Sequence, residues 1–89
     1  MDRTQIREKA GHVLITFLAH RGHEVTLAEL DNLRSVGLDS LSMAELIFEV
    51  CEAFSIDDRL IRDDQLRSIT SLGTLVDAIE DALTLSATN

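Results

Sequence analysis

Residues 37–54 read GLDSLSMAELIFEVCEAF, and this stretch holds both a helix start and a long helical pattern. Asp39 and Ser40 carry side-chain oxygens that can accept hydrogen bonds from the unpaired N–H groups of a first helical turn. Gly37 precedes them and gives the backbone freedom to turn sharply. The stretch therefore predicts a helix over residues 39–54, with Ser40 in its first turn.

One side of this helix is acidic. At about 100° per residue, Glu45, Glu49 and Glu52 fall on one narrow stripe together with Ser42. Six acidic residues and no lysine or arginine occur from residue 39 to residue 58. Such a stripe is either a solvated face or a docking surface for basic partners. Its position directly after Ser40 favours the docking surface.

The rest of the helix circumference is apolar over an arc of roughly 220°. That arc is wider than a helix on the surface of a small bundle normally buries. We therefore expect some apolar side chains to remain available to a partner or ligand. Met43 and Leu46, near the acidic edge, are the candidates.

Working outward from this helix, the remaining pattern is also helical. Apolar residues recur at helical spacing in two further segments, near residues 4–20 and 71–84. Residues 23–38 carry a weaker signal and predict a long connection that places occasional apolar side chains on the core. A short helix is expected within residues 57–67, and a frayed tail over residues 86–89.

These elements predict an all-α fold, a small four-helix bundle of three longer helices and one short helix. With 89 residues, the chain has room for a single domain, residues 1–89, and too little for a deep catalytic cleft. We therefore do not expect an enzyme.

The net charge limits the classes of partner that the chain is expected to bind. Sixteen acidic and eight basic residues give a formal net charge of −8. A field of this sign repels nucleic acid and anionic membrane surfaces and attracts partners with basic patches. No secretory or membrane-spanning segment is evident, and the single Cys51 allows no internal disulfide. We expect a cytoplasmic monomer.

The run Gly37-Leu38-Asp39-Ser40-Leu41, with Glu45-Leu46 and Glu52-Ala53-Phe54 after it, resembles the signature of acyl and peptidyl carrier proteins. The resemblance extends to the helix order and the acidity. It implies that Ser40 receives 4′-phosphopantetheine from coenzyme A through a phosphopantetheinyl transferase, and that Asp39 supports this attachment. Acyl, ketide or aminoacyl intermediates would then be carried as thioesters.

The same resemblance suggests how partners and cargo are contacted. Acyl- or aminoacyl-loading and synthase enzymes with basic patches would dock on the second helix. The expected docking residues are Met43, Glu45, Leu46, Glu49 and Glu52. The expected acyl-chain contacts are Leu46, Ile61 and Ile69.

Some positions depart from the pattern of many fatty-acid carriers. Ser35-Val36-Gly37 stands where Asp-Leu-Gly is common, and Ser42 and Cys51 stand where acids are common. The stretch from residue 57 to residue 69 is also slightly longer than expected for a housekeeping fatty-acid carrier. These departures favour a specialised carrier of secondary metabolism or of a dedicated lipid pathway.

The same residues allow a function other than that of a carrier. An unmodified acidic helical module that docks a basic partner is the main alternative. His12, His20 and His23 lack cysteine or carboxylate partners in a matching cluster, so no metal site is predicted. Ser40 is not in a G-x-S-x-G turn, which argues against a hydrolase. Cys51 is predicted to be a buried, inert thiol.

Overall fold

The computed structural model describes residues 2–88, and for Ser40 and residues 86–88 it describes the backbone alone. The described residues form helices and no strands, so the predicted all-α four-helix bundle is confirmed. The elements are α1 (Arg3–His20), η1 (Leu27–Asp31), α2 (Ser40–Phe54), η2 (Asp58–Leu60), α3 (Asp63–Ser68) and α4 (Leu72–Thr88), where η marks a 3-10 turn.

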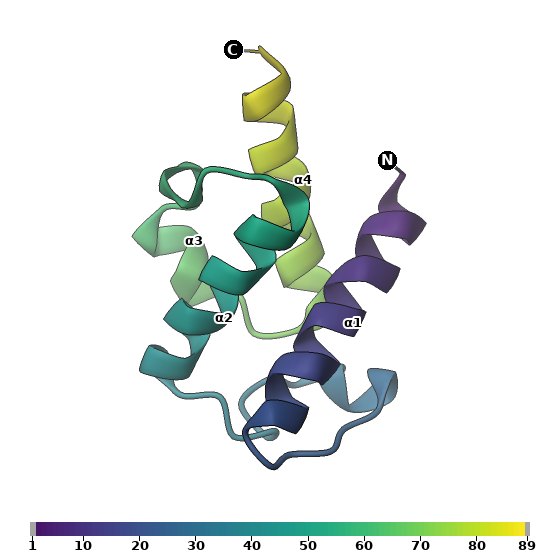
Figure 1. Cartoon of the computed structure of the whole chain (residues 1–89). Helices are drawn as coiled ribbons and strands as arrows, with labels where there is room; N and C mark the ends of the chain where they lie inside the picture. The colour runs from purple at the N-terminus through teal and green to yellow at the C-terminus, as the bar shows by residue number, and fades with distance from the viewer. Residues whose placement is uncertain (1, 89) are drawn as a thin grey trace.

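The three longer helices form the body of the bundle. α1 packs against both α4 and α2, and the short α3 lies beside α2 (Figure 1). The two chain ends lie at one end of the bundle (Figure 1). The long connection from α1 to α2 crosses the opposite end, so α2 begins there. This arrangement places the first turn of α2 far from both termini.

The core draws side chains from every part of the chain. Leu14, Leu46, Leu75 and Ile79 are fully buried. The connection between α1 and α2 contributes as well, as its scattered apolar residues predict. Its buried side chains are Leu30, Leu33, Val36 and Leu38. Each of them removes apolar surface from water, which holds a largely irregular segment against the helices.

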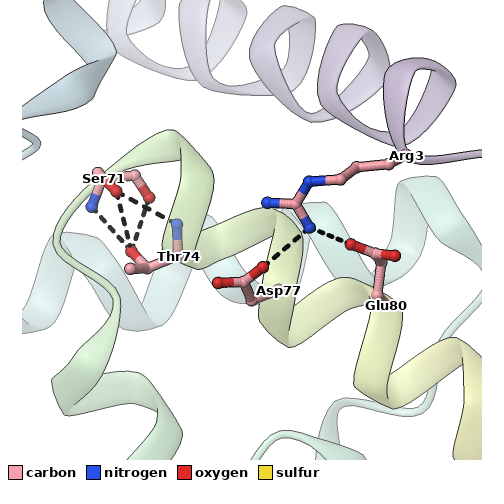
Figure 2. Close-up of polar contacts among 5 residues, drawn as sticks. All are labelled: Arg3, Ser71, Thr74, Asp77 and Glu80. Atoms are coloured by element: carbon pink, nitrogen blue, oxygen red, sulfur yellow. Dashed lines mark hydrogen bonds and ion pairs between the residues drawn. The ribbon is translucent and has the colours of Figure 1, made fainter.

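Polar contacts fix the start of α4. The backbone N–H of Thr74 donates to Ser71 Oγ at 3.2 Å, and Thr74 Oγ1 accepts from the N–H of Ser71 at 2.9 Å (Figure 2). These reciprocal bonds satisfy donors that a helix start leaves unpaired. Arg3 of α1 reaches across to α4, where its Nη1 lies 2.8 Å from Asp77 and also pairs with Glu80 (Figure 2). The contacts tie α1 to α4 near the chain ends.

The short helix expected within residues 57–67 is present as the 3-10 turn η2 followed by α3, which extends one residue beyond that range to Ser68. One expected boundary is wrong. The frayed tail from residue 86 is wrong as far as Thr88, because α4 continues to that residue, while Asn89 lies outside the described residues. No glycine or proline follows Leu83, so nothing in the sequence stops the helical hydrogen bonds there.

Gly11 marks the close crossing of η1 over α1 and offers a test of the packing. A Cβ added at Gly11 would lie 2.7 Å from Leu27 Cδ2 and 3.7 Å from Leu72 Cδ2. Leu27 is 51% exposed, so its side chain is free to move away. We expect Gly11→Ala to raise the free energy of unfolding by up to about 1 kcal/mol, because alanine favours a helix interior. Urea unfolding measures this change.

Gly73→Ala is the matched control, since its added Cβ would meet only Ser71 Oγ at 3.7 Å. It reports the helix-propensity gain without the Leu27 contact. A Gly11→Ala protein less stable than wild type would show that Leu27 is held rigidly in place.

Candidate functional site

Ser40 is the first residue of α2, and Asp39 is its N-cap. Asp39 Oδ1 accepts a hydrogen bond from the backbone N–H of Ser42 at 2.8 Å, and the Asp39 carbonyl accepts from the N–H of Met43 at 2.8 Å. Gly37 just before them has a φ of +88°, which side chains rarely adopt. The glycine, the cap and the first turn together fix the backbone at Ser40.

The Asp39 carboxylate is stabilised in its charged form. The hydrogen bond from the Ser42 backbone lowers the pKa of Asp39, and the Ser42 hydroxyl and the charge of Arg21 lower it further. A hydrogen-bonded carboxylate at a helix N-terminus also faces the positive end of the helix dipole. The first turn of α2 therefore keeps a negative cap through the neutral range.

Arg21, which ends α1, reaches the first turns of α2. Its Nη1 lies 3.2 Å from Ser42 Oγ, and its Nη2 pairs with Glu45. The guanidinium also stacks over the ring of Phe17 at 4.5 Å from the centroid. One cation thus joins the end of α1 to the side of α2 that follows Ser40.

The predicted docking residues do not all reach the surface. Glu45, Glu49 and Glu52 are exposed, and Met43 is half-buried. Leu46 is fully buried, so the expectation that it is left for a partner is wrong. The reason is the rotation of α2. Leu46 lies one turn after Ser42 and one turn before Val50, and this edge of the helix points into the bundle.

The exposed apolar residues of α2 lie on the other edge of its apolar arc. Leu41 is 71% exposed and Phe48 is 52% exposed, with the exposed Ala44 between them. At 100° per residue these side chains share one face and border the glutamate stripe. The sequence signal for these exposed residues was the width of the apolar arc of α2. That width indicated that some apolar side chains stay exposed, but it did not indicate which edge of the arc they occupy.

A surface cavity of about 560 Å³ opens beside Asp39, between the α1–α2 connection, α2 and α3. Its apolar lining includes Leu33, Leu38, Met43, Leu66 and Ile69. Its charged lining consists of Arg34 and Arg67 together with Asp39 and Asp63. Neither arginine forms an ion pair with another described residue. An apolar floor with nearby guanidinium groups suits a flexible chain joined to a phosphate.

The three predicted acyl contacts separate in the structure. Ile69 lines the cavity beside Asp39. Ile61 lines a neighbouring hollow that it shares with Phe48. Leu46 lines neither of them. The structure therefore does not bring these three residues together around one cavity.

A family model described as phosphopantetheine attachment site matches residues 18–79, well over half of the chain. The chain belongs to this family. Domains of the family carry 4′-phosphopantetheine as a covalently attached prosthetic group and are carriers rather than enzymes. No curated protein and no solved structure matched the chain. The match includes the first turn of α2 and the cavity beside it.

The residues present fit this prosthetic group. The N-terminus of α2 offers the positive end of a helix dipole to a phosphodiester. Arg34 and Arg67 offer guanidinium groups to the phosphate at the cavity rim, beside the acidic Asp39 and Asp63, and the apolar floor can accept the pantetheine chain. The carrier domain thus has a suitable surface for the group next to Ser40.

Neither Cys51 nor any of the three histidines lines this cavity. Cys51 is buried, as predicted, and burial raises the pKa of its thiol to about 11, with Asp58 and Asp57 adding to the effect. The thiol therefore stays protonated and unreactive near neutral pH. Within residues 2–88, no group of three or more potential ligand side chains could hold a metal ion. No helix of that range is long and apolar enough to cross a membrane.

The lowered pKa of Asp39 predicts a pH-dependent contribution to stability. Its folded pKa lies below the ordinary aspartate value of about 3.9, so the stabilisation is present above about pH 4 and is lost as the pH falls through the folded pKa. Asparagine also caps helices but does not titrate. We expect wild type to exceed Asp39→Asn in stability near about pH 7, and the gap to shrink near about pH 3.

Urea midpoints of both proteins at the two pH values measure this gap. Comparing the two proteins cancels the titration of the other carboxylates. A gap that stays constant with pH would contradict the capping role of the charged form.

Proposed function

We propose that Ser40 bears the 4′-phosphopantetheine arm and that the protein delivers acyl, ketide or aminoacyl intermediates to partner enzymes. The observation that carries this proposal is the position of Ser40, at the capped start of α2 and within the matched residues 18–79. When bound, the arm supplies a terminal thiol that holds the cargo as a thioester. The protein itself supplies the attachment point and the surfaces that partners recognise.

The proposed docking face combines charge and apolar surface. Glu45, Glu49 and Glu52 form the acidic part, and Leu41 and Phe48 form the apolar part beside it. The net charge of −8 would draw in partners with basic patches, such as a phosphopantetheinyl transferase and the loading and synthase enzymes. Exposed aromatic side chains often supply much of the binding energy in such contacts.

The departures from the pattern of fatty-acid carriers bear on the pathway. Fatty acid, polyketide, nonribosomal peptide and specialised lipid biosynthesis all use carriers with this arm. The departures at Ser35-Val36-Gly37, Ser42 and Cys51 support a specialised carrier over a housekeeping fatty-acid carrier. Ser42 is buried, and its hydroxyl helps to lower the pKa of Asp39. A carboxylate at this position could not donate to Asp39 and would repel it. We place the carrier in the cytoplasm as a monomer.

The attachment is tested by intact mass. Purified protein is incubated with coenzyme A, magnesium and a broad-specificity phosphopantetheinyl transferase. We expect one phosphopantetheine increment on wild type and none on Ser40→Ala, because that variant lacks the accepting hydroxyl.

Ser35→Ala is the control, five residues earlier in the same connection. It loses only an exposed hydroxyl that donates to the Asn32 carbonyl at 2.9 Å, so it should be modified like wild type. An increment that persists on Ser40→Ala would place the arm elsewhere.

The docking face is tested by truncating its exposed aromatic residue. Phe48→Ala should lower the transferase kcat/KM about fivefold or more, as expected for loss of a binding hot spot. Its unfolding midpoint should change little, because the ring is 52% exposed. Initial rates of modification at fixed salt give kcat/KM.

Leu27→Ala is the matched control. Leu27 is 51% exposed but lies on η1 rather than α2. It should leave kcat/KM within about twofold of wild type. Equal losses in both variants would show that the transferase does not select the α2 face.

The alternative is an unmodified acidic module that binds a basic partner through the same face. The exposed glutamates and Phe48 would serve that function equally well. It differs in its requirement for Ser40, because an unmodified module takes up no group from coenzyme A. Folded wild-type protein that gains no mass with several transferases would favour this alternative.

A further inference from the structure

The three glutamates of the α2 stripe are not equivalent, because among the described residues only Glu45 has an ion-pair partner. Arg21 forms an ion pair with it and also contacts Ser42 Oγ. Glu49 and Glu52 form no ion pair with another described residue. The glutamate nearest to Ser40 in sequence is thus the one already occupied by a cation.

Arg21 is held in place by contacts that do not depend on Glu45. Its backbone N–H donates to the Leu18 carbonyl at 3.0 Å, which fixes the residue at the end of α1. Its guanidinium lies over the Phe17 ring, where a cation is favourable. Its charge also suits the negative end of the α1 dipole. The cation is therefore preorganised beside Glu45 and loses little freedom on pairing with it.

We propose that Arg21 is an internal competitor for Glu45, so that a basic partner docks chiefly through Glu49 and Glu52. A lysine or arginine of the partner reaches Glu45 only by displacing Arg21, which exchanges one ion pair for another. The net gain from Glu45 is then small. The unpaired Glu49 and Glu52 offer their full attraction. This inference rests on the proposed docking face, and it assigns unequal roles within that face.

The expected size follows from exposed ion pairs. Arg21 and Glu45 have side chains 37% and 49% exposed, so each pair they form is screened by solvent. Removing Arg21 from Glu45 should change the transferase kcat/KM by about twofold to fivefold. This factor corresponds to the free energies measured for exposed ion pairs. The effect should weaken as salt is raised.

The experiment is a double-mutant cycle on the initial rate of phosphopantetheine attachment. In wild type, Glu49→Gln should lower kcat/KM about twofold to fivefold, and Glu45→Gln should change it by less than about twofold. In the Arg21→Gln background, Glu45→Gln should lower kcat/KM as much as Glu49→Gln does. Arg21→Gln alone should raise kcat/KM.

Arg7→Gln controls for the change in net charge. It removes the same charge from α1, about 21 Å further along the helix axis. The Glu45→Gln effect in this background should stay as small as in wild type. A Glu45→Gln effect that rises equally with Arg7→Gln would overturn the inference in favour of general electrostatics.

A second route covers the case in which Arg21→Gln does not fold. Phe17→Leu removes the ring beneath the guanidinium but keeps the charge, and it should raise the Glu45→Gln effect in the same direction by a smaller amount. The inference is overturned if Glu45→Gln has the same effect in every background. If wild-type protein gains no phosphopantetheine, the proposed function is overturned together with this inference. If wild type is modified but the cycle shows no coupling between Arg21 and Glu45, only the role of Arg21 is overturned.

Discussion

Burial of the Leu46 and Val50 edge of α2 sets the rotation of that helix in the bundle. Both side chains are fully buried, and Ser42 one turn earlier is buried with them. Once this edge faces inward, the geometry of a helix leaves no choice about the rest of the circumference. Leu41 and Phe48 must face outward, and the glutamates lie between the buried edge and these exposed residues. The surface next to Ser40 is a consequence of core packing.

The first turn of α2 depends on a separate set of polar contacts. Asp39 caps the helix, Gly37 turns the chain ahead of it, and Ser42 connects the cap to Arg21. These contacts hold the backbone around Ser40, the proposed attachment site, while the neighbouring Asp39 and Leu41 stay exposed. A carrier domain needs this combination, because its partners must find one residue in a defined place. The chemistry of transfer is left to the prosthetic group and the partner enzymes.

The charged residues of the domain contribute to the proposed partner recognition more than to folding stability. Its exposed ion pairs contribute little to folding, and the net charge of −8 opposes compaction. The apolar core, which includes side chains from the long α1–α2 connection, must supply the main favourable energy. We attribute the acids on α2 to the proposed recognition of basic partners. The arginine at the end of α1 then divides these acids into one occupied and two available carboxylates.

The sequence by itself determined the location of the three longer helices, the cap at Asp39 and the family signature around Ser40. Those features depend on residues close together in the chain, where helical periodicity and capping act. The tertiary structure alone decided that Leu46 is buried and Phe48 exposed, and that Arg21 pairs with Glu45. A helical pattern shows which residues share a face, but the rotation of that face depends on the helices packed against it. Arg21 and Glu45 are 24 residues apart, and no local pattern relates them across the long connection.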